Sequence, residues 1–82
     1  MHYSDGNSAA LGDQVLLSGT HHGVVVSNID DDEYSTICPK ENWTYLGSGV
    51  IIDTDFGGLV HYEQASLTHE NIELEHRAKE NF

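Results

Sequence analysis

The sequence has few basic residues. Three of them, Lys40, Arg77 and Lys79, stand against 14 acidic residues in a chain of 82, which gives a formal net charge of −11. Binding of DNA or RNA normally needs several Lys or Arg contacts to phosphate, so we expect no direct nucleic-acid binding. Anionic membrane surfaces are disfavoured for the same reason. The charge permits a basic partner, either a protein or a cation, although acidity can also serve solubility alone.

Other absences bound the location and the stability of the protein. The single cysteine, Cys38, cannot form an internal disulfide. The N-terminus lacks the basic start and long apolar segment of a signal peptide, and no run approaches the roughly 20 apolar residues that span a bilayer. We therefore expect a soluble, reduced, cytoplasmic protein. A chain of 82 residues forms one domain, whose stability is modest unless oligomerisation or a ligand adds to it.

Hydrophobic patterns predict several short strands. Residues 12–17 open the first strand, and the valine-rich run 23–29 is apolar on both faces, which indicates a central or doubly covered strand. Residues 50–55 and 59–62 flank a Phe-Gly-Gly turn, as in a β-hairpin. Alternation near residues 72–74 favours a closing strand over a helix. Residues 40–46, which follow Pro39, predict a short α or 3₁₀ turn with Trp43 and Leu46 facing inward.

These elements indicate an all-β or mainly β fold. Four to five short strands with tight turns suit a small antiparallel SH3-like barrel better than a sandwich, which needs about seven strands. We predict a flexible N-terminal arm over residues 1–11, one barrel domain over residues 12–76 and a polar tail over residues 77–82. One short helical turn completes the prediction.

Two patterns in the sequence resemble known groups of proteins. Gly12-Asp13-x-Val15, followed by Gly19, Gly23 and Val24-x-Val26, resembles the opening of KOW-type SH3-like modules. Those modules bind RNA or protein through basic loops, but the loop here has no Lys or Arg, so the RNA role does not transfer.

A longer pattern includes Gly23-Val24-Val25-Val26, Trp43-x-Tyr45-Leu46 and Gly58-Leu59-Val60-His61-Tyr62. It resembles a group of small acidic bacterial proteins encoded among mobile genes, such as integron gene cassettes. The resemblance implies an architecture and a mobile-gene setting, and it implies no activity.

The preferred hypothesis is a non-enzymatic interaction module that binds a protein, with a basic partner favoured. It would act as an inhibitor, an immunity factor or an adaptor. Four adjacent carboxylates form an exposed acidic turn, and aromatic or histidine side chains near loops can form a shallow peptide groove. The predicted partner-binding residues are Asp30, Asp31, Asp32, Glu33, Tyr34, Trp43 and His61.

An apolar surplus predicts self-association. With Val15, Leu17, Val24, Val26, Val50 and Ile52 assigned to one interior, Leu16, Val25 and Ile51 fall on the outward strand faces. Outward apolar residues on neighbouring strands form the kind of patch that marks an interface. We therefore predict a homo-oligomer interface at Leu16, Val25 and Ile51, unless a terminal segment covers them.

Motifs for catalysis, metals or cofactors are missing, so we predict none of the three. The adjacent His21 and His22 point to opposite sides of an extended backbone and cannot easily share an ion. Cys38 lacks the accompanying signals of a catalytic nucleophile. The alternative hypothesis is a small-ligand or metal-binding module, formed where His21, His22 and His61 of different subunits converge.

Overall fold

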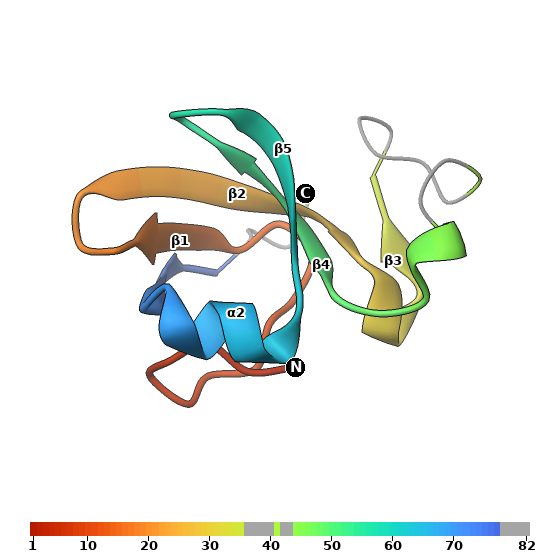
Figure 1. Ribbon diagram of the computed structural model, residues 1–82, viewed down its shortest axis with the longest axis horizontal. Coiled ribbons are helices and arrows are strands. Elements are labelled where there is room, and N and C mark those ends of the chain that lie inside the picture. The colour runs from red at the N-terminus through yellow and green to blue at the C-terminus, as the bar shows by residue number, and fades with distance from the viewer. Residues whose placement is uncertain (36–40, 42–43, 78–82) are drawn as a thin grey trace.

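The computed structural model describes residues 1–35, 41 and 44–77. Its strands form one antiparallel sheet in the order β5-β4-β2-β1-β6, and β3 pairs with the end of β2 (Figure 1). The strands are β1 (Gln14–Leu17), β2 (His21–Asn28), β3 (Glu33–Tyr34), β4 (Val50–Thr54), β5 (Gly58–Tyr62) and β6 (Ile72–His76). Helix α2 (Gln64–His69) and the 3₁₀ turns η1 (Ile29–Asp31) and η2 (Thr44–Leu46) join them.

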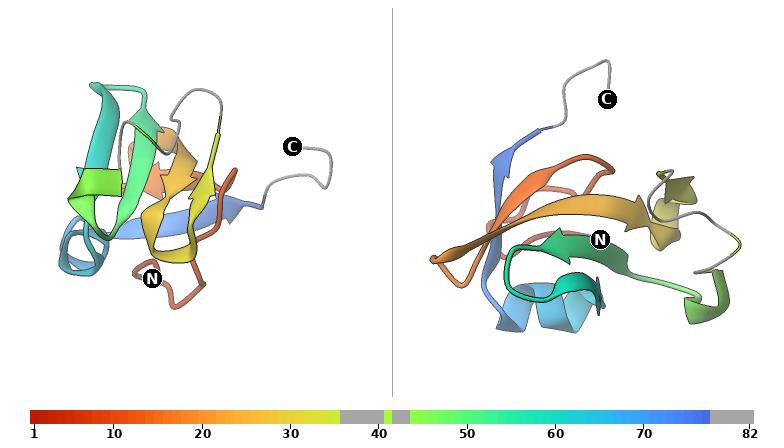
Figure 2. Two further views of the ribbon diagram at one scale, coloured as in Figure 1. Left: turned by 90° about the vertical axis from the view of Figure 1, so that its right-hand side faces the viewer. Right: turned by 90° about the horizontal axis from the view of Figure 1, so that it is seen from above.

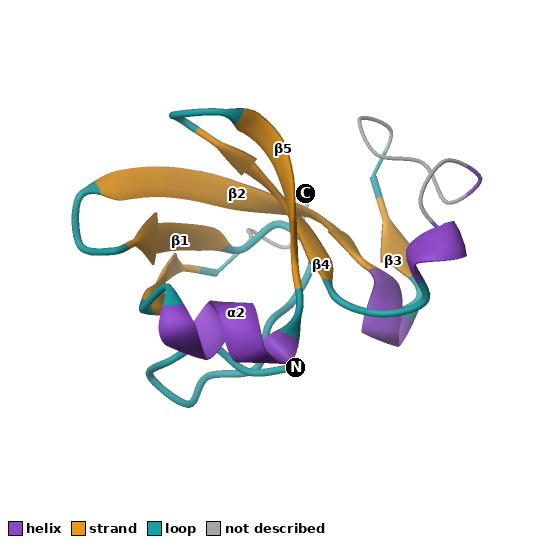
Figure 3. Ribbon diagram, in the orientation of Figure 1, coloured by secondary structure: helices purple, strands orange, loops and turns teal. Residues whose placement is uncertain are grey.

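The mainly β, antiparallel class is confirmed, but the sheet is not a closed barrel. Within the described ranges, β5 and β6 end the sheet without pairing with each other. Helix α2 connects these two strands and contacts both, and it lies beneath the sheet in Figure 3. It covers the core there with side chains, where a barrel would close the gap with backbone hydrogen bonds.

The predicted hairpin of residues 50–62 and the closing strand near residues 72–74 are confirmed, and the predicted first two strands are present and pair with each other. Turn η2 fits the predicted single 3₁₀ turn, whereas Trp43 and Cys38 lie outside the described residues. Helix α2 is absent from the prediction, because Leu67 is its one buried residue and gives no helical periodicity. No helix in the described part is long and apolar enough to cross a membrane.

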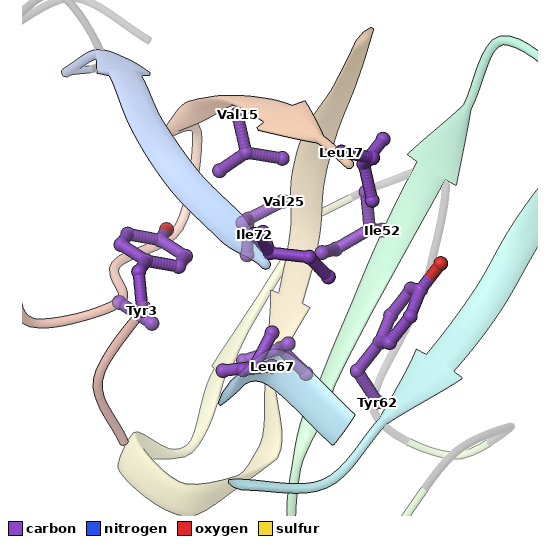
Figure 4. Packing of buried hydrophobic residues seen from close by; sticks show 10 residues of the cluster. Tyr3, Val15, Leu17, Val25, Ile52, Tyr62, Leu67 and Ile72 are labelled. Carbon is purple, nitrogen blue, oxygen red and sulfur yellow. The ribbon is translucent and has the colours of Figure 1, made fainter. Parts of the chain in front are cut away.

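Buried side chains form clusters on both faces of the sheet. The larger cluster contains Val25 and Ile52, which pair directly across β2 and β4, and it extends to Leu67 of α2 (Figure 4). The smaller cluster contains Val26, Ile29 and Ile51, with Tyr34 and Leu46 packed against it. Turn η1, strand β3 and turn η2 lie at the end of the molecule opposite the β1–β2 turn (Figure 2).

This arrangement corrects the predicted oligomer interface. Val25 and Ile51 are completely buried inside the chain, so neither can belong to an exposed patch. The prediction placed Val24 on the same face as Ile52, but the register pairs Val25 with Ile52 and puts Val24 with the smaller cluster. The assumption of one interior was wrong, because each strand of the central pair buries both of its faces. Leu16 alone of the three is half-buried.

Residues 1–11, predicted as a flexible arm, instead pack against the sheet. Tyr3 and Ala9 belong to the larger cluster, and the Tyr3 hydroxyl donates a hydrogen bond of 2.6 Å to Oδ2 of Asp13. The same oxygen accepts bonds from the Ala10 backbone N–H (3.0 Å) and from Nη1 of Arg77 (2.9 Å). Asp13 is fully buried, so this cluster joins both ends of the chain to the start of β1.

Candidate functional site

The smaller cluster covers only part of its face of the sheet, and a groove of about 420 Å³ lies on the open part. We call it the acidic groove, and it crosses β6, β1, β2 and β4. Gln14, Val24 and Asp53 stand in one cross-strand row, because Gln14 pairs with Val24 and Val24 pairs with Asp53. Alternation of side chains along a strand brings this row to one face. His22, Asp55 and Glu75 complete the lining.

A β-bulge places one of these carboxylates. In the pairing of β1 with β6, Val15 faces Leu74 and Gln14 faces His76, so Glu75 is an extra residue without an opposite number. Bulges bend a strand and redirect side chains. Glu75 Oε1 lies 3.1 Å from Nδ1 of His22. The bulge thus brings a carboxylate from the last strand beside a histidine at the start of β2.

Asp55 is held by the beginning of β2. Its Oδ2 accepts the His22 backbone N–H at 3.0 Å, and its Oδ1 lies 3.1 Å from Nδ1 of His21. The backbone hydrogen bond from His22, followed by the attraction of His21, lowers the pKa of the Asp55 carboxyl below its ordinary value. Its side chain nevertheless keeps 45% of its surface exposed, so it still presents charge to solvent.

No lysine or arginine in the described part of the chain neutralises the groove. Arg77, the one such side chain there, is paired with Asp13 at 2.9 Å. Asp53 is exposed and has no hydrogen-bond or ion-pair partner among residues 1–35, 41 and 44–77. The groove therefore combines an apolar floor at Val24 with the carboxylate of Asp53, which has no partner in the described part of the chain, and with the carboxylates of Asp55 and Glu75, which lie against histidines.

The predicted acidic turn is exposed, but most of its carboxylates already accept hydrogen bonds from nearby groups. Asp30 Oδ1 accepts the Gly49 backbone N–H at 2.9 Å, and Asp31 Oδ2 accepts Asn28 Nδ2 at 2.9 Å. Glu33 Oε1 accepts a backbone N–H at 3.3 Å, and Asp32 adopts the left-handed conformation that ends η1. These carboxylates shape the turn around η1, and their role in partner binding stays a prediction.

The remaining predicted residues do not come together with that turn into one site. Tyr34 packs partly against the smaller cluster, and Trp43 lies outside the described residues. His61 Nε2 lies 2.8 Å from the Ser48 carbonyl oxygen and 3.3 Å from Glu63 Oε1, so it ties the loop before β4 to the end of β5. Leu16 neighbours the groove through its pairing with His22.

Among the described residues, no three or more His, Cys, Asp or Glu side chains lie close enough together to hold a metal ion. His21 and His22 each face a different carboxylate, and His61 belongs to the other end of the β4–β5 hairpin. The alternative of a metal or ligand site at a subunit interface stays a prediction that needs a second chain.

Comparisons of the chain with family models, with curated proteins and with solved structures find no match.

Proposed function

We propose that this chain is a non-enzymatic interaction module that binds a basic segment of a partner protein in the acidic groove. The observation that carries the proposal is the set of three carboxylates, Asp53, Asp55 and Glu75, around an apolar floor with no lysine or arginine among the described residues to neutralise them. A lysine or arginine can lay its aliphatic stem on Val24 and direct its charge to these carboxylates. The net charge of −11 adds long-range attraction for a basic partner.

In this proposal the main contact with the partner lies in the acidic groove and not at the acidic turn. Carboxylates of that turn already accept hydrogen bonds from backbone and side-chain donors, whereas Asp53 has no partner in the described part of the chain. Groups without internal partners lose less on binding and gain more from a new cation. The acidic turn then contributes to the rate of encounter, and the groove contributes to the lifetime of the complex.

Fluorescence anisotropy with a labelled Lys-Gly octapeptide tests this assignment. The groove variant carries Asp53→Asn and Glu75→Gln, and the matched control carries Asp32→Asn and Glu33→Gln, so both lose the same charge. We expect the groove variant to weaken binding about tenfold and the control about twofold, because screened distant charges contribute little. For the unmodified chain, affinity should fall as salt rises from 50 to 300 mM.

Three outcomes are informative. A selective loss in the groove variant supports the proposal. Equal losses in the two variants would show diffuse attraction and would reject the groove as the site. Absence of binding to any basic peptide at 50 mM salt would reject the function itself.

The setting of this function is part of the same proposal. The resemblance supports a mobile-gene origin, the lack of signal-peptide and membrane-spanning patterns supports a cytoplasmic location, and the acidic charge supports a role as inhibitor, immunity factor or adaptor for a basic partner. Self-association now rests on Leu16 and on the exposed Leu59, since Val25 and Ile51 are buried. Light scattering after size-exclusion chromatography measures it directly, and a monomer at high concentration would reject it.

A further inference from the structure

A second hollow, of about 260 Å³, lies where the β1–β2 turn meets the β4–β5 turn. We call it the aromatic pocket. The rings of His21, Phe56 and Tyr62 line it together with Glu70, the C-cap residue that follows α2. His21 and Phe56 have ring centroids 4.9 Å apart and planes inclined by 59°, so they form an angled wall. One water takes up about 30 Å³ in the liquid, so the hollow has room for the end of a long side chain.

Two oxygen-bearing groups of this pocket lack partners. Tyr62 is 6% exposed, yet its hydroxyl has no hydrogen-bond partner among the described residues. That hydroxyl is not one of the fully buried unpaired atoms, and it points away from Leu67 in Figure 4, so it opens onto the pocket. Burial, followed by the charge of Glu70, raises the pKa of Tyr62. The Glu70 carboxylate has no partner within the described ranges either.

These groups define the chemistry of the occupant. An anion would meet Glu70 and a net charge of −11, and a purely apolar group would leave the Tyr62 hydroxyl and the carboxylate unpaired. A flat cation with several N–H donors satisfies both oxygens and stacks on an aromatic face. Phe56 is 54% exposed and offers such a face at the rim.

We propose that the aromatic pocket binds the guanidinium group of an arginine side chain. For the source of that arginine the inference rests on the proposed function, namely the basic segment bound in the acidic groove. The pocket opens on the face of the larger cluster and the groove on the opposite face, and the two sites meet at the end of the sheet, where His21 of the pocket and Asp55 of the groove are paired at 3.1 Å. A segment that continues from the groove around this end of the sheet can place an arginine side chain in the pocket.

Equally charged Arg-Gly and Lys-Gly octapeptides test the pocket by fluorescence anisotropy. We expect the arginine peptide to bind the unmodified chain about three- to tenfold more tightly, since guanidinium stacks and donates bidentately where ammonium does not. Phe56→Ala and Glu70→Gln should each reduce this preference to near one. Glu73→Gln removes the same charge outside the pocket and should weaken both peptides while leaving the ratio intact.

Failure of the pocket can be told apart from failure of the function. If both peptides bind the unmodified chain equally, the pocket inference is overturned and the groove stands. If neither binds, the function falls, and NMR titration with n-butylguanidinium against n-butylammonium decides the pocket alone. Larger shifts of the Phe56 and Tyr62 ring signals with the guanidinium would support it, and equal or absent shifts would overturn it.

Discussion

Replacing Tyr3 by phenylalanine isolates the hydrogen bond that ties the N-terminal segment to the core. The Tyr3 hydroxyl donates to Asp13 Oδ2 at 2.6 Å, and both residues are buried. Phenylalanine keeps the ring and its apolar contacts but removes the donor. The Asp13 carboxylate keeps its hydrogen bonds from the Ala10 N–H and the Arg77 guanidinium, so it loses one donor but is not left without a partner.

The expected magnitude follows from the charge of the acceptor. A hydrogen bond to a charged group is worth about 1.5–3 kcal/mol, so Tyr3→Phe should lower the free energy of unfolding by about that amount. The free energy of unfolding of a natural domain is about 5–15 kcal/mol in all, and that of a chain this small belongs at the lower end of the range. Guanidinium denaturation followed by circular dichroism measures the loss. Tyr45→Phe is the control, because Tyr45 is 78% exposed.

The dependence on pH provides a second signature. Burial, then the hydrogen bond to Asp13, raises the pKa of Tyr3, so its contribution is complete below the unfolded value and is lost as pH rises toward the folded one. Above pH of about 10 the wild type should lose about 1.4 kcal/mol per pH unit more than Tyr3→Phe, so the gap between them closes. A Tyr3→Phe loss no larger than that of Tyr45→Phe, with parallel pH profiles, would refute the reasoning.

Three further predictions test other parts of the structure. Gly49→Ala should destabilise the protein by about 2 kcal/mol or more, because φ is +99° and the added Cβ would lie 2.5 Å from a backbone oxygen; a smaller loss in denaturation would contradict this. NMR titration should place the pKa of Asp55 below its ordinary value, and His21→Ala should raise it only in part, since the backbone donor from β2 contributes most; full recovery would contradict that ranking. Ile51→Ala should cost about 2–5 kcal/mol and half-buried Leu16→Ala less than about 1, so equal losses would reject the double-sided core.

Much of the strand layout could be predicted, because it depends on local pattern. The valines of β2 and the alternation in β4 and β5 are visible in short windows. The face that each residue occupies depends on register between distant strands, and here Val25, not Val24, stands opposite Ile52. A shift of one residue exchanges the two faces, so a correct strand prediction still gave an incorrect interface.

The candidate site could be predicted less well, since its groups come from separate strands. A run of four carboxylates is visible in the sequence, but Asp53 and Glu75 meet only through the sheet and the bulge in β6. The adjacent His21 and His22 are visible in the sequence, but the carboxylates that each of them pairs with are not. The contact of Tyr3 with Asp13 likewise joins a segment that composition alone assigned to a flexible arm.

The junction between the chain ends has a consequence for synthesis. Ser4 N–H bonds to the Ile72 carbonyl oxygen at 2.8 Å, and Arg77 reaches the Ser8 carbonyl at 2.7 Å, so the N-terminal segment can dock only after the last strand has left the ribosome. At about 5–20 residues per second, β1 waits about 3–12 s for its partner β6. During this interval the backbone edge of β1 is unpaired, and the net charge of −11 opposes its pairing with other nascent chains by like-charge repulsion.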